Sequence, residues 1–554
     1  MRITYNDKLN KLLNPYLESL LKEKSSLEPE TLTLFDLFME DLDMGGRYGI
    51  FSEILEPRLE EIIREENIES IANLMDGRLN TLFRYMLGDE FAGLFHTYLQ
   101  LEARCPHTIG YDRRAQRSAN PSNHLDHARD AWLQFLKLRA TGFSVEAILK
   151  GGNTPEDTEE FSGYMNSSYW LAAQIAQGNE KVIEYLNQVL TSENNVHRLQ
   201  RWYLHAIAIS GYRPLLELEG KLLLAAKLQE GLRQAIVETM DEGCPESYLY
   251  LFSIIYNNGL QRFASVKRSI AVCTGIGEQD SSERITNKYV ELIWNFLNHP
   301  ETARNALQSK DTVELYLALW SIGFYDTDEI RAIVPDIIRK GAKHQIQTLL
   351  YFLRCTQSSQ MNHLISKDAF EVWHDDPKVV AAILPLYMDG LYLSRYSDNK
   401  EAPTLSDYFE SPEEAVRHYG YLKQVYQSIS AKEVYSPYVF PWDCVVLTRS
   451  DVVLKMAYIA WMTNDIRLRE ELCTYLPALE SYNRASYIGI VLARTESKVE
   501  QEYVLQSLGD RSADIRDEAY KVLSEMSLSP EQYQHIEELL RFKYSEMRIN
   551  AINL

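Results

Sequence analysis

Apolar residues along this chain of 554 residues recur mostly with the spacing of an α-helix. In the segment 515–523 they fall at positions i, i+4, i+7 and i+8, and the segment 330–338 repeats this spacing. Such a pattern places an apolar stripe on one face of a helix. Strand-like alternation is scarce, and its best candidate is the short run 445–447, Val-Val-Leu. The pattern therefore predicts an all-α protein.

Helices are predicted to follow one another in pairs along much of the chain. Acidic residues open the segment 328–340 and Gly341 follows it, as helix ends favour. Pro335 lies inside this helix and is expected to bend it. A second helix is expected over 345–353. Similar pairs are predicted over 181–210, 214–240, 246–272 and 311–353.

The last forty residues contain a visible repeat. Arg516 and Arg548 each precede an alanine by three residues, and they are 32 residues apart. This is the length of one helical-hairpin repeat. The apolar stripe of the second copy continues to Leu554. We therefore expect a continuation of the same chain beyond this residue, or a partner that covers it.

The repeat and the helix pairs before it resemble HEAT and armadillo-type α-solenoids. This resemblance implies a right-handed superhelix of helical hairpins, with an irregular helical N-terminal region. The chain also resembles the N-terminal helical part of large bacterial proteins related to those called molybdate metabolism regulators. The residues that carry it are 262–268 (Arg-Phe-Ala-Ser-Val-Lys-Arg), 440–442 (Phe-Pro-Trp) and the terminal repeat. It implies a regulatory role and supplies no catalytic residue.

Four regions are expected. Residues 1–130 form an acidic helical region that ends in a basic loop rich in His and Arg. Residues 131–395 form irregular HEAT-like hairpins. Residues 396–450 form an insertion with an aromatic and proline-rich loop. Residues 451–554 form C-terminal HEAT-like repeats that stop inside a helix.

Composition and charge narrow the class of partner. The chain is 45% hydrophobic and 25% charged, which is ordinary for a globular protein. Its formal net charge of −22 argues against nucleic-acid binding, which depends on Lys and Arg that neutralise phosphates. The same charge argues against adsorption to an anionic membrane. It favours a protein or peptide partner, and in particular a basic one.

The cysteines and the N-terminus indicate a cytoplasmic protein. The six cysteines are scattered, and no pair has the CxxC spacing. The first residues lack the apolar core of a signal peptide. The longest apolar run, 379–388, contains a proline and is about half the length that spans a bilayer.

Histidine and cysteine are concentrated between residues 96 and 127. Cys105 and His107 are two residues apart, and His124 and His127 lie on one face if their segment is helical. These four side chains are candidate zinc ligands, although their spacing matches no standard zinc finger. The alternative is that they cap helices and line the surface.

Arginines gather in the same region of an otherwise acidic chain. Arg113, Arg114 and Arg117 are candidate ligands for an anion or a phosphopeptide, because guanidinium groups bind phosphate and carboxylate in pairs. The alternative, which the sequence favours, is that the acidic N-terminal region pairs with them.

The segment 435–442 carries aromatic residues on a loop that its prolines keep from being helical. Tyr435, Tyr438, Phe440 and Trp442 are candidate anchors for a partner, since Tyr and Trp dominate interface hot spots. Equally, these rings fit the seam between neighbouring helix pairs.

His374 and Asp375 resemble the His-Asp pair of all-helical metal-dependent phosphohydrolases. Such a site needs another histidine and a distant aspartate, for which His363 and Asp389 are available. The alternative is a turn whose acidic residues begin the next helix.

The sequence therefore predicts a protein-interaction scaffold, expected to be the N-terminal arm of a larger regulatory protein. The alternative is a metal-binding protein or metal-dependent hydrolase that uses the His/Cys cluster at 96–127 or His374 and Asp375. The scaffold rests on analogy at the level of the fold.

Overall fold

A computed structural model of the chain divides it into two compact units. Unit 1 contains residues 1–306 and 320–327, and unit 2 contains residues 307–319 and 328–554. The structure describes residues 7–43, 79–102, 104–105, 107–109, 112–116, 135–149, 165–192, 198–226, 229–274, 285–325, 327–356, 359–396, 400–429, 434–437, 444–493, 495–541 and 545–554.

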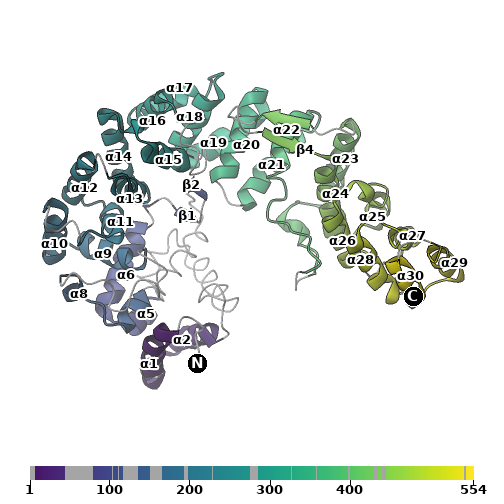
Figure 1. Cartoon of the computed structure of the whole chain (residues 1–554), viewed down its shortest axis with the longest axis horizontal. Helices are drawn as coiled ribbons and strands as arrows, with labels where there is room; N and C mark the ends of the chain where they lie inside the picture. Colours follow the sequence, from purple (N-terminus) through teal and green to yellow (C-terminus); the bar gives the residue numbers. More distant parts are fainter. Residues whose placement is uncertain are drawn as a thin grey trace. The chain divides into compact units, whose positions relative to one another are not determined.

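The described elements of unit 1 are helices and one short hairpin (Figure 1). They are α1 (Asp7–Glu23), η1 (Lys24–Ser26), α2 (Pro29–Asp43), α5 (Leu79–Leu87), α6 (Asp89–Glu102), β1 (His107–Ile109), β2 (Asp112–Gln116), α8 (Val145–Leu149), α9 (Met165–Ala176), α10 (Glu180–Thr191), α11 (Arg201–Ser210), α12 (Arg213–Ala225), α13 (Glu230–Asp241), α14 (Pro245–Asn258), η4 (Leu260–Arg262), α15 (Ala264–Cys273), α16 (Asn287–Asn298) and α17 (Pro300–Ala306).

Two rows of helices make up most of unit 1. One row contains α6, α9, α11, α13 and α15, each packed on the next. The other contains α8, α10, α12, α14 and α16, again in contact one with the next (Figure 1). Consecutive helices therefore alternate between the rows, and every helix packs on neighbours close to it in sequence.

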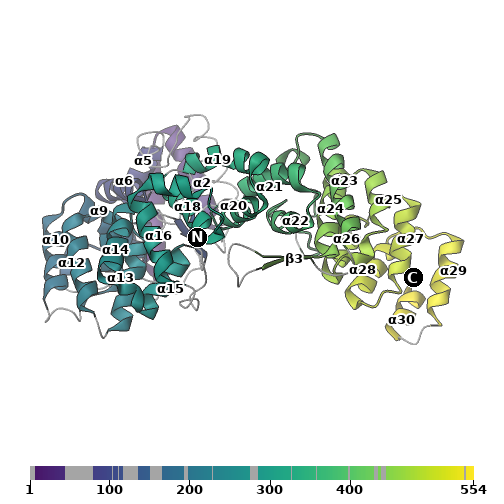
Figure 2. The same ribbon diagram turned by 90° about the horizontal axis from the view of Figure 1, so that it is seen from above.

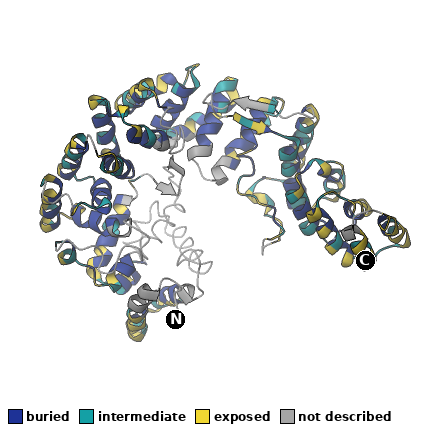
Figure 3. Cartoon of the chain, viewed as in Figure 1, coloured by how far each residue is buried: buried dark blue, intermediate teal, exposed yellow. Residues whose placement is uncertain are grey.

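The core of unit 1 lies along the first row. Every residue of α11 from Trp202 to Ser210 is buried (Figure 3). A helix that is apolar on all sides is stable only inside a protein, and α11 meets this condition because helices of both rows pack on it. Gly211 ends α11 in the left-handed conformation, at φ 65°.

Helices α12 and α14, which are neighbours in the second row, leave little space at Gly220 of α12. A Cβ atom at this position would lie 2.6 Å from Cδ1 of Ile254 and 2.8 Å from the hydroxyl of Tyr250. Glycine therefore permits the close approach of α12 and α14. Its neighbour Glu219 is fully buried, and Thr239 of α13 donates a hydrogen bond of 3.5 Å to it. Burial raises the pKa of Glu219 well above 4.5, because the charged form loses its hydration there.

Unit 2 is also helical, and α18 (Thr312–Tyr325) spans the division between the units. Its elements are shown in Figure 2. They are α19 (Thr327–Lys340), α20 (Lys343–Thr356), α21 (Ser359–Trp373), α22 (Pro377–Ile383), η6 (Leu405–Asp407), α23 (Pro412–Ser428), β3 (Val434–Pro437), β4 (Cys444–Leu447), α24 (Arg449–Thr463), α25 (Ile466–Leu472), η7 (Leu476–Ala478), α26 (Ser481–Ile490), α27 (Lys498–Ser507), α28 (Ala513–Ser524), α29 (Pro530–Leu539) and α30 (Ser545–Asn553).

Helices of unit 2 pack mainly on those next to them in sequence or one removed. α25, α27 and α29 follow one another, and α26 packs on α28. Arg469 of α25 donates from Nε and Nη2 to the two carboxylate oxygens of Glu500 in α27, each at 2.8 Å. Glu500 is fully buried, so this two-bonded ion pair satisfies its charge where water cannot.

The all-α prediction is confirmed, because the structure is mostly helical. The strand candidate at 445–447 is also confirmed: β4 pairs antiparallel with β3, and Val446 lies opposite Tyr435. The pair predicted over 311–353 is wrong, because α18, α19 and α20 occupy that range. None of the helices that the structure describes is long and apolar enough to cross a membrane.

The raised pKa of Glu219 predicts that the free energy of unfolding depends on pH. A glutamate whose pKa is raised by folding stabilises the native state below pH 4.5, and this contribution is lost as pH rises toward the native pKa, at ~1.4 kcal/mol per pH unit. Replacement of Glu219 by Gln should remove this dependence. We therefore expect the melting temperature of the wild type to fall relative to that of the variant as pH is raised from about 5 to about 8, the range in which most proteins are stable.

Glu217→Gln is the matched control, because Glu217 lies on the same helix and is exposed. Its melting curve should follow that of the wild type in pH dependence. Parallel curves for the wild type and Glu219→Gln would show that Glu219 is ionised in the fold.

Candidate functional site

The predicted zinc ligands fall largely outside the described structure. Cys105 is half-buried, and His107 begins β1, which pairs with β2 so that His107 lies opposite Gln116. His124 and His127 lie outside the described residues. The zinc site therefore stays a prediction.

The predicted anion ligands are divided in the same way. Arg113 and Arg114 lie in β2, and Arg117 lies beyond the described part of the hairpin. Among the aromatic anchors, Tyr435 is in β3. The other three, Tyr438, Phe440 and Trp442, lie outside the described residues. Both binding sites stay predictions.

His374 and Asp375 do not form the centre of a metal site in the described structure. The His374 ring stacks on Tyr421, with centroids 3.8 Å apart and planes at 14°. Asp375 is almost fully exposed. His363 is engaged by the backbone at both ring nitrogens: Nε2 lies 2.8 Å from the Tyr408 carbonyl, and Nδ1 accepts from the amide of Met388 at 2.9 Å. Burial lowers the pKa of His363 to about 4, so the ring is neutral and holds two chain segments together.

A different group brings acidic and histidine side chains together. Glu371 of α21 and Glu414 and His418 of α23 offer ligand atoms that all lie within 4.8 Å of one another, the sole such group in the described residues. This acid–histidine cluster joins two helices of unit 2. Its composition of two carboxylates and one imidazole is that of many metal sites.

Both carboxylates of the acid–histidine cluster already have cationic partners. Lys367 lies 3.0 Å from Glu414, and Arg417 lies 2.7 Å from Glu371. Lys367 is buried, so its charge needs Glu414. A divalent ion would have to displace these two cations. The arrangement therefore fits an ionic network between helices better than a metal centre.

Hydrogen bonds extend the acid–histidine cluster into the core. The hydroxyl of Tyr387, fully buried, lies 2.8 Å from Nδ1 of His418, and Nε2 of His418 lies 3.0 Å from Glu371. Burial lowers the pKa of His418, although Glu371 and Glu414 oppose this shift. Neutral His418 thus accepts from Tyr387 and donates to Glu371. Burial raises the pKa of Glu371, but hydrogen bonds from Arg417 and His418 outweigh it, so the pKa is lowered overall.

The acid–histidine cluster was not predicted from the sequence, although one of its two helices carries a recognisable pattern. Glu414, Arg417, His418 and Tyr421 follow the i, i+3, i+4 and i+7 spacing, which predicts one polar face on a helix. The spacing does not show which helix that face meets.

Unit 1 contains a serine, a histidine and a glutamate in contact. The hydroxyl of Ser168 lies 2.9 Å from Nδ1 of His205, and Nε2 of His205 lies 3.8 Å from Glu242. The order resembles a hydrolytic triad. However, Ser168 is completely buried, and a nucleophile must reach its substrate. The group therefore fits a polar contact between helices.

Exposed aromatic rings gather on unit 2 around Tyr482. We call Tyr392, Tyr396 and Tyr482, with Arg395 between the first two in sequence, the tyrosine surface. Tyr392 is 66% exposed and Tyr396 is 72% exposed. The rings of Tyr396 and Tyr482 have centroids 6.4 Å apart, and the hydroxyls of Tyr392 and Tyr482 lie 3.0 Å apart.

Contacts beneath the tyrosine surface hold these rings in place. Nη2 of Arg395 donates to the hydroxyl of Tyr396 at 2.8 Å and also to the carboxylate of Asp514. The hydroxyl of Ser394 lies 2.9 Å from that of Tyr482. The rings are thus exposed but fixed, so a partner would not have to order them on binding.

Comparison with known proteins places the chain in a family. Residues 34–554 match a family model described as "Family of unknown function (DUF5724)". The chain belongs to the DUF5724 family. No curated protein and no solved structure matches it. Because the family description assigns no activity, the function of this DUF5724 protein has to be argued from its contacts.

The ionic network predicts how this DUF5724 protein responds to mutation and to metal. Glu371→Gln removes the negative charge and one of the two oxygens that accept from Arg417, His418 and Tyr421, so it should lower stability by ~1–2 kcal/mol. Asp375→Asn is the control, because Asp375 is exposed and its replacement should not change the melting temperature.

Thermal unfolding with zinc and with a chelator then distinguishes an ionic network from a metal site. Zinc should leave both melting temperatures unchanged. An increase in the wild type that Glu371→Gln abolishes would show a metal site.

Proposed function

We propose that the protein is a protein-interaction scaffold that binds its partner through the tyrosine surface. The observation that supports this proposal is that Tyr392 and Tyr396 are both more than half exposed, while hydrogen bonds to Tyr482 and Arg395 hold their side chains in place. Tyr and Arg are the residues most enriched in interface hot spots. An exposed aromatic group that is already ordered costs little entropy when it binds.

We further propose that the helix pairs form an α-solenoid of HEAT-like hairpins. The alternation of consecutive helices between two rows in unit 1 supports this, because stacked hairpins bury their apolar faces against their neighbours. The 32-residue spacing of Arg516 and Arg548 supports it in unit 2, where α28 and α30 carry these residues.

The partner in this proposal is a protein segment, and a basic one is favoured by the charge of the chain, −22. A cytoplasmic location agrees with the scattered cysteines. A regulatory role rests on the resemblance to proteins related to molybdate metabolism regulators. The alternative of a metal-dependent hydrolase gains no support from the acid–histidine cluster, whose carboxylates are already paired.

Replacement of the exposed tyrosines tests this proposal. Tyr392→Ala with Tyr396→Ala removes the two exposed rings and should leave the fold intact, because neither ring is in the core. The protein and its variants are used to capture partners from cells that contain it. We expect a partner that the wild type retains and the double variant retains at least tenfold less, since each hot-spot residue contributes ~2 kcal/mol or more.

Tyr533→Ala is the matched control. Tyr533 is an exposed tyrosine of α29, 46% accessible, and lies outside the tyrosine surface. It should capture as much partner as the wild type. Equal recovery by all three proteins, or no recovery by any, would contradict a role of the tyrosine surface.

A further inference from the structure

The tyrosine surface has more hydrogen-bond donors than its own contacts use. The hydroxyls of Ser394, Tyr482 and Tyr392 form a chain, with oxygen–oxygen distances of 2.9 Å and 3.0 Å. Each hydroxyl has one proton, so the two hydrogen bonds of the chain leave one proton unused. Ser394 is buried, and a buried hydroxyl has to use its donor, so Ser394 donates to Tyr482. The unused proton therefore lies on Tyr392 or Tyr482.

Tyr396 supplies a second unused donor. Its oxygen accepts from Nη2 of Arg395 at 2.8 Å. Arg395 cannot take the phenol proton in return, because a guanidinium group has no acceptor. Within the described part of the chain this proton has no other acceptor, and the residue is 72% exposed. A partner that is rich in hydrogen-bond acceptors would therefore satisfy two phenol donors on this surface.

Arg395 supports the tyrosine surface and is not itself available to a partner. Its Nη1 donates to the carbonyl oxygen of Asp514 at 3.3 Å, and its Nη2 donates to the Asp514 carboxylate and to Tyr396. The side chain is only 8% exposed. Because the guanidinium is occupied and covered, this arginine does not favour an acidic partner.

Two exposed carboxylates of α28 lie beside this support. Asp514 uses Oδ1 for Arg395, and its side chain is 55% exposed. Asp517 follows three residues later, on the same face of the helix, and is also exposed. Among the described residues Asp517 has no hydrogen-bond or ion-pair partner. These carboxylates favour a partner that carries Lys or Arg next to its apolar part.

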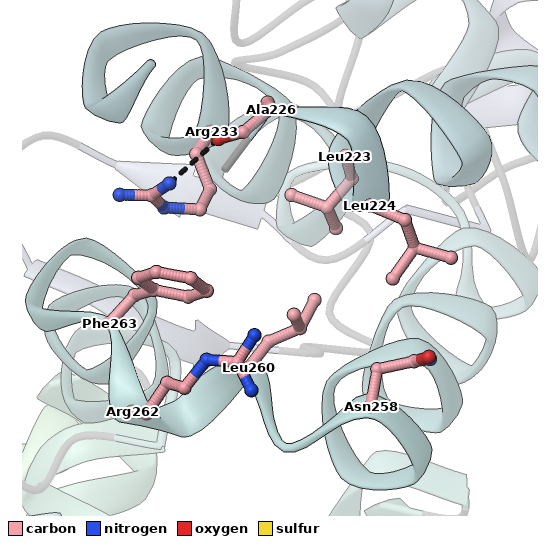
Figure 4. A pocket seen from close by; sticks show the side chains of 8 residues that line it. All are labelled: Leu223, Leu224, Ala226, Arg233, Asn258, Leu260, Arg262 and Phe263. Atoms are coloured by element: carbon pink, nitrogen blue, oxygen red, sulfur yellow. Dashed lines mark hydrogen bonds between the residues drawn. The ribbon is translucent and has the colours of Figure 1, made fainter. Parts of the chain in front are cut away.

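An arginine and an aromatic ring also meet at a pocket of unit 1, but there they are part of the core packing (Figure 4). The pocket has a volume of about 290 Å³, and its lining includes Leu223 and Leu260, which are buried. Arg233 donates to the carbonyl of Ala226 at 2.7 Å, and its guanidinium carbon lies 3.9 Å from the centre of the Phe263 ring. Because Arg233 is only 6% exposed, it holds the helices together, whereas Arg395 holds exposed rings in place.

We propose that the partner segment that binds the tyrosine surface is proline-rich, adopts the polyproline II conformation and carries a basic residue at one end. This inference rests on the proposed function and names the chemistry of the partner. Prolines have carbonyl acceptors and no N–H donor, and polyproline II uses none of its carbonyls internally. These carbonyls accept from the unused phenol protons. The pyrrolidine rings pack on Tyr392 and Tyr396, and the basic residue lies near Asp517.

A helix or a β-strand matches the tyrosine surface less well. A helix uses most of its carbonyls in its own hydrogen bonds, so few remain for the phenol donors. A β-strand needs a sheet edge that pairs with its N–H groups. Tyr482 lies in α26, and Tyr392 and Tyr396 lie in a segment without strand structure. A polyproline II segment is already extended before it binds, so it loses little conformational entropy on rings that are already ordered.

Fluorescence anisotropy of labelled peptides on the full chain tests the inference. The first peptide contains eight prolines followed by two arginines. The second has alternating Gly and Ser in place of the prolines, and the third has Gln in place of the arginines. We expect the first peptide to bind in a 1:1 ratio and the Gly-Ser peptide to bind about tenfold more weakly, because its chain has to be ordered. The Gln peptide should bind about threefold more weakly, as for an exposed charge pair.

Tyr396→Phe tests the hydrogen-bond donor separately from the ring. The variant keeps the aromatic ring and loses the phenol proton, so it should bind the first peptide about fivefold more weakly than the wild type, the effect of one neutral hydrogen bond. Tyr533→Phe is the matched control, because Tyr533 is an exposed tyrosine outside the tyrosine surface, and its affinity should equal that of the wild type. Melting temperatures check that both variants are folded.

Asp517→Asn tests the position of the basic residue. Asp517 is exposed and makes no ion pair within the described residues, so the variant should fold. It should bind the arginine and glutamine peptides equally, because the carboxylate that distinguishes them is gone. An undiminished difference between the two peptides would show that the basic residue does not lie near Asp517.

Three results would overturn the inference of a proline-rich partner. They are failure of the first peptide to bind at millimolar concentration, equal binding of the proline and Gly-Ser peptides, and equal affinity of Tyr396→Phe and the wild type. Capture from cells decides the proposed function separately. A partner that is lost when Tyr392 and Tyr396 are replaced by Ala, together with no binding of the proline peptide, would exclude a proline-rich segment and keep the tyrosine surface as the interface. Failure of both experiments would overturn both proposals.

Discussion

The structure depends on one constraint: no helix pair of this chain can bury its apolar face alone. In the two rows of unit 1 each helix packs on the next helix of its own row, and α9 to α14 also pack on a helix of the other row. Apolar burial is thus shared between neighbours, at ~25 cal/mol per Å² of surface removed from water. Helix α11 shows the result most clearly, since Trp202–Ser210 are buried on every side. Close contacts such as that at Gly220 follow from the same constraint, because helices that share their burial, here α12 and α14 of one row, must approach closely.

The same packing brings acidic side chains between helices, and three of them are accommodated in three different ways. Burial raises the pKa of Glu219, which favours its neutral form, and Thr239 donates a hydrogen bond to it. Glu500 stays charged and forms a two-bonded ion pair with Arg469. Glu371 is half-exposed and accepts hydrogen bonds from an arginine and a histidine of α23. The more completely a carboxylate is buried, the more it needs a proton or a directly opposed cation.

Much of the fold could be predicted from sequence because its signal is local. Helical periodicity and capping residues predicted the helix over 328–340 closely, and α19 spans Thr327–Lys340. Periodicity did not reveal the boundary after Tyr325, so the range 311–353 was predicted as a pair where three helices exist. Polar residues mark that boundary instead, because the run 326–329, Asp-Thr-Asp-Glu, interrupts the apolar positions before Ile330.

The candidate sites could be predicted much less well, because they depend on which helices meet. The sequence predicts that the face of α23 that carries His418 is polar. It does not predict that this face contacts Glu371 of α21. The tyrosine surface joins Tyr392 to Tyr482, which are 90 residues apart, and the pocket joins Leu223 to Phe263. His, Cys and Arg residues that are close together in the sequence are the easiest to propose as a site. They need not lie close together in the fold.

The two rows of unit 1 also bear on how the protein loses its structure. Most helices that contact each other there are adjacent in sequence or separated by a single described helix, so most of these contacts close only a short loop; the contact of α6 with α11 is an exception. Structures built from such local contacts fold quickly, and their stability is a sum over neighbouring units. The ion pair of Arg104 with Glu246 is an exception that spans 142 residues. Interior pairs are supported on two sides and terminal pairs on one. Loss of structure in denaturant should therefore begin at the ends of the rows and advance inward, without the all-or-none transition of a small globular domain.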